Sequence, residues 1–131
     1  MNIESILRKH KKSVTQERID IFYYIKSNHM FCANDIILQF SEIWRASIFR
    51  TIKLFLEIWI IRRLYLSDKE EVYELNKSSN HHEHMKCEKC WDIINYESEK
   101  ICKKIFNEAK KIWFNIREHN IWVIWTCKKC I

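Results

Sequence analysis

Four cysteines, arranged as two Cys-x-x-Cys pairs, are the residues whose types and spacing most clearly indicate chemistry. The pairs are Cys87 with Cys90 and Cys127 with Cys130. Each turn aims two sulfurs at one point, and two such turns make the tetrahedral thiolate cage that Zn²⁺ prefers. One pair alone would also suit redox exchange, and six cysteines in a secreted chain would suit disulfides. Two pairs in one chain favour a structural zinc site.

The C-terminal half must fold so that the two pairs meet. The patterns predict short strands over residues 84–87 and 92–96 and a helix with one apolar stripe over 101–112. A strand pair is expected over 114–125, with its turn near His119. An α/β unit of about fifty residues buries little core by itself. We therefore expect zinc and a partner subunit to stabilise it.

The N-terminal half is predicted to be helical as far as residue 58. Thr15 is placed to cap one helix, because its hydroxyl can accept from backbone N–H groups of the first turn. Asn34 is expected to cap a short helix over 35–40. A further helix is predicted over 45–56 from the helical spacing of its apolar residues.

Strand-like patterns replace the helical ones from residue 60. Residues 60–66 and 71–75 predict a β-hairpin with a polar turn at 67–70. Helices followed by a hairpin are typical of a winged helix-turn-helix. Residues 1–66 carry 11 basic and 6 acidic residues, which suits an anionic partner. A helical domain that binds another protein through a solvated basic face is the competing interpretation.

A polar linker over residues 76–80 separates two predicted domains. The predicted fold class is α+β, with a winged helix-turn-helix domain over 1–76 and a small zinc-stapled α/β domain over 77–131. The hydrophobic fraction of 47% excludes a disordered chain. Charges interrupt every apolar stretch, so no membrane span of about 18 residues is expected. The N-terminus lacks the pattern of a signal peptide. We therefore expect a cytoplasmic protein without a membrane partner.

Motifs along nearly the whole chain resemble the ferric uptake regulator (Fur) family of metal-responsive transcriptional repressors. Residues 45–52, Arg-Ala-Ser-Ile-Phe-Arg-Thr-Ile, resemble the family's recognition helix, and residues 72–75 resemble the end of its wing. The most specific motif is the His-rich run over 81–84 that leads into Cys-x-x-Cys, with His119 placed eight residues before Cys127. The resemblance implies a homodimer with an N-terminal DNA-binding domain and a C-terminal dimerisation and metal-binding domain.

By this resemblance the four cysteines hold the structural zinc, and a sensed Fe²⁺, Mn²⁺ or Zn²⁺ binds between the domains. Four residues match that sensing site or lie next to its positions: His82, His84, Glu74 and His29. His29 stands one residue before the family's usual histidine position, which Met30 occupies, and Asn95 replaces a carboxylate. Imidazole with carboxylate suits these ions. Solvated surface histidines are the alternative.

A second metal site of the family matches four further residues: His81, Glu83, Cys102 and His119. Cys102 stands where the family has a glutamate. A thiolate there would favour a softer ion such as zinc. The alternative is that Cys102 packs as a small buried hydrophobe.

The expected DNA contacts lie on and around the recognition helix. Ser47 and Arg50 are expected to be exposed and to read base edges in the major groove, and Phe49 to contact a thymine methyl. Contacts to phosphates, which position without specifying, are expected from four residues: Lys11, Lys12, Arg45 and Lys53.

The predicted function is a metal-dependent repressor of metal-uptake or peroxide-stress genes that binds double-stranded operator DNA. One alternative is a zinc or iron storage or delivery protein that uses the His/Cys cluster without DNA. Another is a zinc hydrolase, since His-His-x-His can bind a catalytic ion. No paired base or nucleophile motif accompanies the histidines, so we expect no enzyme.

Glycine is absent from all 131 residues, whereas tryptophan occurs six times. Trp59 lies between a predicted helix and a predicted strand, where a positive φ is natural. Trp91 and Trp125 flank the cysteine pairs, where tight turns are expected. A Cβ resists left-handed conformations, so indoles suit such turns poorly. One hypothesis is a gene whose UGA codons mean glycine but were translated as tryptophan. The alternative is genuine tryptophans that fill a core or a dimer interface.

Overall fold

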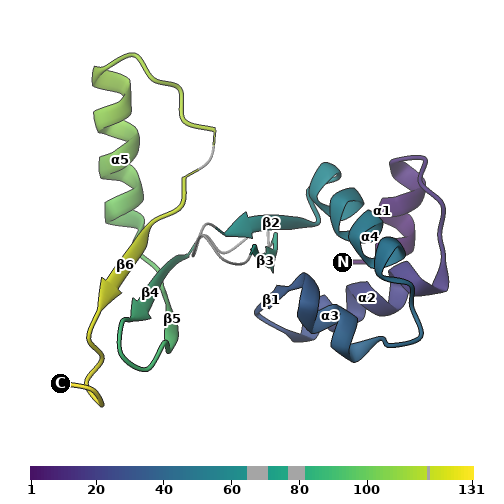
Figure 1. The fold of residues 1–131 in the computed structure, drawn as a ribbon. Helices are drawn as coiled ribbons and strands as arrows, with labels where there is room; N and C mark the ends of the chain where they lie inside the picture. Colours follow the sequence, from purple (N-terminus) through teal and green to yellow (C-terminus); the bar gives the residue numbers. More distant parts are fainter. Residues whose placement is uncertain (65–70, 77–81, 118) are drawn as a thin grey trace. The chain divides into compact units, whose positions relative to one another are not determined.

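The computed structural model describes residues 1–64, 71–76, 82–117 and 119–131. Contacts within the chain divide it into two compact units, Met1–Asn76 and Lys77–Ile131. Helices and strands occur in both units, in the order shown in Figure 1. The predicted α+β class is therefore confirmed. None of the described helices is long and apolar enough to cross a bilayer.

Four helices form most of the first unit: α1 Ile3–Lys9, α2 Gln16–Ser27, α3 Ala33–Gln39 and α4 Arg45–Glu57. The predicted cap of α2 is confirmed, because the Thr15 hydroxyl accepts from the Arg18 N–H at 3.4 Å. The predicted start of α3 is wrong by two residues. Cys32 is the N-cap, and its backbone N–H donates to the Asp35 carboxylate at 2.8 Å. Asp35 in the first turn thus closes the helix start, and Asn34 lies inside the helix.

A three-stranded antiparallel sheet completes the first unit. Its strands are β1 Met30–Cys32, β2 Ile61–Leu64 and β3 Val72–Leu75, in the order β1-β3-β2. The predicted hairpin strands β2 and β3 pair with Leu64 opposite Val72. The predicted turn at 67–70 lies outside the described residues. β1 was not predicted, since three residues are too short to give an alternating pattern.

Apolar side chains from helices and sheet form one core in the first unit. On α4, Ile48, Ile52 and Phe55 are buried on the predicted face. Phe55 meets Phe22 of α2 edge to face, with ring centroids 6.4 Å apart. Edge-to-face pairs are favourable beyond the area they bury. This core fixes α4 and leaves its opposite face in solvent.

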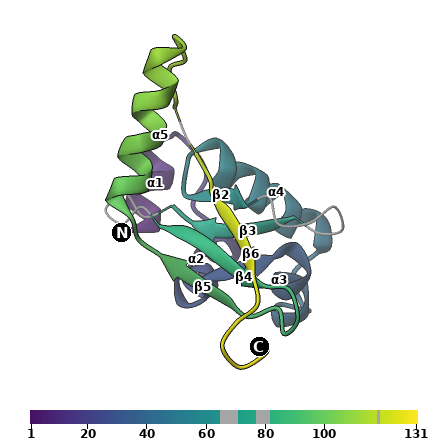
Figure 2. The ribbon, with the colours of Figure 1, turned by 90° about the vertical axis from the view of Figure 1, so that its left-hand side faces the viewer.

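The described residues of the second unit form one helix and three strands: β4 Glu83–Cys87, β5 Ile93–Tyr96, α5 Glu99–Lys111 and β6 Trp122–Trp125. β4 lies between β5 and β6, antiparallel to β5 and parallel to β6 (Figure 2). The predicted strand pair over 114–125 is wrong in its first half, because the described residues 114–117 form no strand. A parallel partner for β4 requires a crossover, and α5 with its following segment supplies it.

Candidate metal centres and recognition helix

The two cysteine pairs come together because of the sheet of the second unit. β4 ends at Cys87, and its parallel register places Trp125 of β6 opposite Cys87. Cys127 follows two residues later, and its backbone N–H donates to the Cys87 sulfur at 3.3 Å. Lys89 donates from its ammonium to the Cys130 carbonyl at 2.9 Å, which holds the two turns together. Strand pairing thus brings together cysteines that are 37 or more positions apart along the chain.

The four sulfurs fit a tetrahedral zinc ion. All lie within 4.8 Å of one another, and the Cys90 and Cys127 sulfurs are 3.6 Å apart. Zn–S bonds of about 2.3 Å place the sulfurs of a tetrahedral site about 3.8 Å apart. Of the predicted zinc ligands, the structure therefore brings all four together. Cys87 and Cys127 are buried, so this site is closed on one side.

The acidities of these thiols are linked. Backbone N–H groups of Cys90 and Cys127 lower the pKa of Cys87 to about 6. Hydrogen bonding with the Cys127 and Cys90 thiols raises the pKa of Cys130 to about 12. Four adjacent thiolates repel one another, so the last proton is held tightly in the absence of a cation. A dication compensates that repulsion, which is the electrostatic condition that zinc satisfies.

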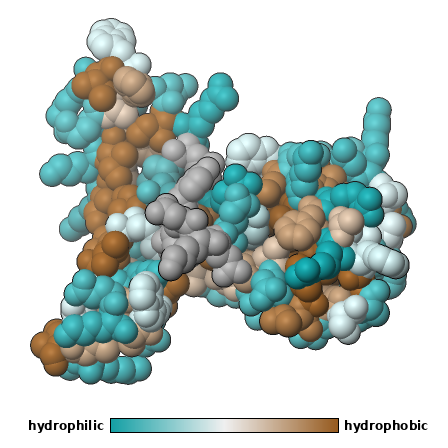
Figure 3. Space-filling view, viewed as in Figure 1, coloured by the Kyte–Doolittle hydropathy of each residue, from teal (hydrophilic) through white to brown (hydrophobic). Residues whose placement is uncertain are grey.

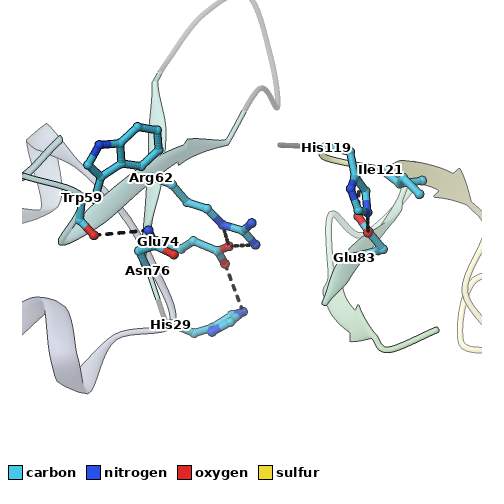
Figure 4. Close-up of polar contacts among 8 residues, drawn as sticks. All are labelled: His29, Trp59, Arg62, Glu74, Asn76, Glu83, His119 and Ile121. Carbon is cyan, nitrogen blue, oxygen red and sulfur yellow. Dashed lines mark hydrogen bonds and ion pairs between the residues drawn. The ribbon is translucent and has the colours of Figure 1, made fainter. Parts of the chain in front are cut away.

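A second donor set in the same unit joins three different ligand types. The His119 Nε2 lies 3.1 Å from Glu83 Oε1 and 3.4 Å from the Cys102 sulfur. The Cys102 sulfur is 3.7 Å from the same Glu83 oxygen. The Ile121 N–H donates to Glu83 Oε2 at 2.7 Å (Figure 4). The set therefore offers one oxygen, one nitrogen and one sulfur. His81, predicted as its fourth member, lies outside the described residues.

The pKa of the Cys102 thiol is raised by burial and by the Glu83 carboxylate beside it. The side chain is half-buried, and its sulfur faces Glu83 and His119. The alternative that Cys102 serves only as packing does not account for these polar neighbours.

Glu74 is the centre of a polar group in the first unit. Its carboxylate is 1% exposed and accepts from the Arg62 guanidinium on the neighbouring strand. The His29 Nε2 lies 4.0 Å from the other Glu74 oxygen (Figure 4). His29 precedes β1, which pairs with β3 so that Met30 lies opposite Glu74. The pairing of β1 with β3 thus explains why His29 reaches Glu74, although it stands one residue early in the sequence.

Arg62 is a neighbour of Glu74 that the sequence did not reveal. It stands opposite Glu74 in the β2–β3 register. Opposite charges at such positions are a recognisable cross-strand pair. Arg62 could have been found only from the register of the hairpin strands, and the strand pattern of the sequence does not determine that register.

His82 and His84 lie close together in the second unit. Both are buried, and their ring centroids are 5.0 Å apart. His84 stacks on Trp122 of the neighbouring strand at 4.7 Å, with an interplanar angle of 14°. Asn95, the residue that replaces the expected carboxylate, stands opposite His84 in β5. The side chains are thus held as a pair by strand β4 and its neighbours.

The predicted DNA-contacting side chains lie on the solvent side of α4 or close to α1. Phe49 and Arg50 are exposed, whereas Ser47 is half-buried. The exposure expected for Ser47 is therefore only partial, and its hydroxyl accepts from the Arg50 guanidinium at 3.2 Å. The four predicted phosphate contacts are exposed: Lys11, Lys12, Arg45 and Lys53.

Comparison with known proteins identifies relatives along nearly the whole chain. The model of the ferric uptake regulator family matches residues 9–124. The peroxide-responsive repressor PerR of Staphylococcus epidermidis is 27% identical over 135 residues, covering 95% of this chain and 85% of that protein. The ferric uptake regulation protein of Synechococcus elongatus is 27% identical over 97 residues, covering 74% of this chain and 66% of that protein.

Solved structures share the fold. The ferric uptake regulator of Pseudomonas aeruginosa with manganese superposes with a TM-score of 0.81, at 23% identity, and covers 98% of this chain and 99% of its own. That of Francisella tularensis with iron gives a TM-score of 0.75 at 25% identity, covering 90% of this chain and 93% of its own. The resemblance seen in the motifs is confirmed, and so is a winged helix followed by a small unit with a four-cysteine cluster.

Proposed function

Because the chain belongs to the ferric uptake regulator family, we propose that it is a metal-dependent transcriptional repressor. Members of this family are metal-responsive transcription regulators and not enzymes. The observation that carries the proposal is the family match over residues 9–124, which spans helices α2 to α5, the hairpin strands and the His-rich run. The protein would act in the cytoplasm on genes for metal uptake or peroxide stress.

Helix α4 is the proposed DNA-reading element. An α-helix fits the major groove, where a few side chains contact base edges. Arg50 offers the bidentate donor that guanine accepts, and exposed Phe49 offers an apolar surface for a thymine methyl. The hydrogen bond from Arg50 to the Ser47 hydroxyl holds the guanidinium along the helix. Lys11, Lys12, Arg45 and Lys53 would meet phosphates and supply salt-dependent affinity.

The four cysteines of the second unit would hold a structural zinc ion. The sensed ion would be held by two pairs of side chains, one from each unit: His29 with Glu74, and His82 with His84. Imidazole and carboxylate donors suit Fe²⁺, Mn²⁺ and Zn²⁺. Such an ion would link the units and favour the form that binds DNA. It can do so only to the extent that it binds that form more tightly than the other.

The second unit is also the proposed dimer interface. Apolar side chains are exposed on its strands and after its helix: Ile94, Tyr96, Val123, Ile124, Ile112 and Phe114. Hydrophobic side chains gather along α5 in Figure 3, beside a groove of about 480 Å³ that Ile105, Ala109 and Ile116 help to line. A second copy of this chain is the proposed occupant. A unit with so small a core gains stability when a partner covers such a face.

Metal-dependent DNA binding tests the proposal directly. The protein, with zinc in the cysteine site, is titrated into labelled promoter fragments of metal-uptake genes and into a random duplex, with and without Mn²⁺, Fe²⁺ or added Zn²⁺. One of these ions should raise the affinity for a specific fragment by about tenfold or more, in the usual range of allosteric coupling. The double variant His82→Ala/His84→Ala should lose this response and keep its structural zinc. Cys32→Ser is the matched control.

Metal storage or delivery is the second candidate, because the described part of the chain alone contains three sets of possible metal donors. Storage predicts several labile ions per chain and no DNA affinity. A repressor predicts a zinc ion held tightly in the four-cysteine site and an affinity for duplex DNA that falls steeply with salt. Absence of any salt-dependent duplex binding with every ion would contradict the repressor and favour storage.

A further inference from the structure

The donor set of Glu83, Cys102 and His119 differs from the other two sets because it mixes oxygen, nitrogen and sulfur. Its three donor atoms are 3.1, 3.4 and 3.7 Å apart. Bonds of about 2.0–2.3 Å place such donors roughly 3.3–3.5 Å apart around a tetrahedral ion. The spacing is therefore that of groups prepared for one shared cation.

The surroundings orient two of these donors. The Ile121 N–H holds Glu83 Oε2 at 2.7 Å, which leaves Oε1 to face His119 and Cys102. Phe106 of α5 packs edge to face on the His119 ring, with centroids 5.4 Å apart. Partners of this kind fix ligand orientation and are a regular part of metal sites. Each donor comes from a different segment of the second unit: β4, α5 and the stretch before β6.

We propose that Cys102 makes this set a zinc-selective site that rejects Mn²⁺ and Fe²⁺. The inference deepens the proposed function, on which it rests, by adding a second ion to the same regulator. A thiolate donor favours zinc over harder ions, whereas carboxylate and water suit manganese. The selectivity of this site therefore depends on one atom, the Cys102 sulfur.

Cobalt is the spectroscopic probe for this site. Protein with zinc in its four-cysteine site is titrated with Co²⁺, while any released zinc is measured. Binding should produce the near-ultraviolet absorption of a single cobalt–thiolate bond, which Cys102→Ser and Cys102→Ala should lose. Cys102→Glu should bind Mn²⁺ better, so that its preference for Zn²⁺ over Mn²⁺ falls about tenfold or more. Cys32→Ser is the control and should keep the absorption.

Cobalt bound without this absorption, or the same absorption in Cys102→Ser and Cys102→Ala, would overturn the inference. Far-ultraviolet circular dichroism of each variant establishes that it is folded. DNA is absent from the assay, so the result is independent of the repressor proposal. If the unsubstituted protein gives no cobalt–thiolate absorption but binds DNA in a metal-dependent way, only the zinc-selective site is contradicted. If it gives the absorption but shows no metal-dependent DNA binding, only the repressor is contradicted.

The backbone carries a second, independent inference. Positive φ angles occur at four non-glycine residues of the described chain: Lys11 at 54°, Trp59 at 60°, Trp91 at 65° and Trp113 at 63°. Three of these four are tryptophan, in a chain with no glycine. The positive φ expected at Trp59 and the tight turn expected at Trp91 are confirmed. Trp125 instead ends strand β6, so the turn expected there is wrong.

Trp59 and Trp113 hold the same position after a helix. The Ile60 N–H donates to the Phe55 carbonyl at 2.8 Å, and the Phe114 N–H donates to the Ala109 carbonyl at 2.9 Å. This pattern ends a helix with a left-handed residue, usually glycine because it has no Cβ. Lys11 ends α1 in the same way. The geometry thus requires a left-handed residue at both tryptophans.

The indoles at these turns lie mostly in solvent, and the Lys86 ammonium covers the Trp91 ring at 4.3 Å from its centroid. Trp59, Trp91 and Trp113 are 65%, 64% and 96% exposed. Within the described chain, a core role for these three is therefore excluded. The two tryptophans of β6, Trp122 and Trp125, bury indole N–H groups for which the described residues provide no acceptor. A buried indole N–H usually finds one. Trp122 does stack on His84, but the described residues give neither buried indole N–H the hydrogen bond that such a group usually makes.

We infer that the native protein carries glycine at the six tryptophan positions, encoded by UGA codons that its cell reads as glycine. One codon assignment accounts for the missing glycine, the left-handed tryptophans and the exposed indoles together. The turns at Trp59, Trp91 and Trp113 are then ordinary glycine turns.

Peptide mass spectrometry of the protein from its own cell tests the inference at Trp59, Trp91 and Trp113. Glycine at these positions is expected, and tryptophan would end the idea. For the chain as printed, Trp59→Gly should raise the folding equilibrium constant about tenfold, because it removes the Cβ from a left-handed position. Trp59→Ala keeps the Cβ and should give no such gain. Equal gains in both variants would contradict the backbone argument.

Discussion

The two units each contain a three-stranded sheet, yet different forces hold them together. In the first, Phe22, Phe31 and Phe55 and their apolar neighbours form a continuous buried core. In the second, the buried described residues are Cys87, Cys127, Ala109, His82, Glu83 and His84. One unit is stabilised by apolar burial, and the other buries mainly ligand atoms. The comparison teaches that the second unit depends on what binds to it, whereas the first can fold from its own side chains.

Removal of a zinc ligand should produce the largest difference in stability between the two units. Cys87→Ser is expected to unfold the second unit and abolish the dimer, since structural zinc contributes about 10–16 kcal/mol in small zinc domains. The first unit should stay folded, because its core does not include Cys87. Zinc content, sedimentation and hydrogen exchange resolved along the chain measure these outcomes. Cys130→Ser should have the same effect, and Cys32→Ser is the control. A stable zinc-free dimer of Cys87→Ser or Cys130→Ser would contradict the claim that the second unit depends on zinc.

Truncation of a core side chain should have the opposite effect, because it destabilises the first unit and leaves the second unchanged. Phe55→Ala removes a fully buried ring that packs on Phe22, and should destabilise the first unit by about 3–5 kcal/mol. Zinc binding by the second unit should be unchanged. Urea unfolding followed by circular dichroism, with zinc release measured in parallel, tests both statements. Loss of zinc at the same urea concentration as loss of α4 would mean that the units unfold as one.

The buried Arg62–Glu74 pair is the exception within the first unit, where charge is held inside an otherwise apolar interior. Arg62→Ala would leave the Glu74 carboxylate, 1% exposed, without its cation. We expect a loss of about 3 kcal/mol, because an uncompensated buried charge is costly. The double variant Arg62→Leu/Glu74→Leu should regain most of that stability in urea unfolding. No difference between single and double variants would show that the pair contributes little.

The smallest expected effect concerns the exposed face of α4. Arg50→Ala should leave stability unchanged and weaken specific DNA binding by about 1–3 kcal/mol, the value of a good bidentate base contact. Lys53→Ala is the matched control on the same helix, and should weaken binding to specific and random duplexes alike. Anisotropy titrations with both duplexes give the ratio. Equal weakening by Arg50→Ala on both would identify it as a phosphate contact.

Local rules let the sequence determine much of this protein. The spacing of Cys87, Cys90, Cys127 and Cys130 was enough to predict the cysteine cluster. Each Cys-x-x-Cys turn is a local geometry, and two such turns together supply the four sulfurs of a structural zinc site. The capping of α2 by Thr15 and the buried face of α4 likewise follow from neighbours within one or two turns. The positive φ at Trp59 could be predicted for the same reason, since a helix end requires it.

Long-range pairing decided the rest. Only strand register places Arg62 beside Glu74 and His29 within 4.0 Å of it, and only the parallel pairing of β4 with β6 brings Glu83 near His119. The described residues 114–117 form no strand. β4 and β6 run parallel, so the chain between the sheet strands must cross over, and α5 with the segment after it makes that crossover. The register between two strands is determined by the sum of many weak side-chain pair energies between segments that are distant in the sequence. A single sequence shows the members of such pairs but not which of them meet.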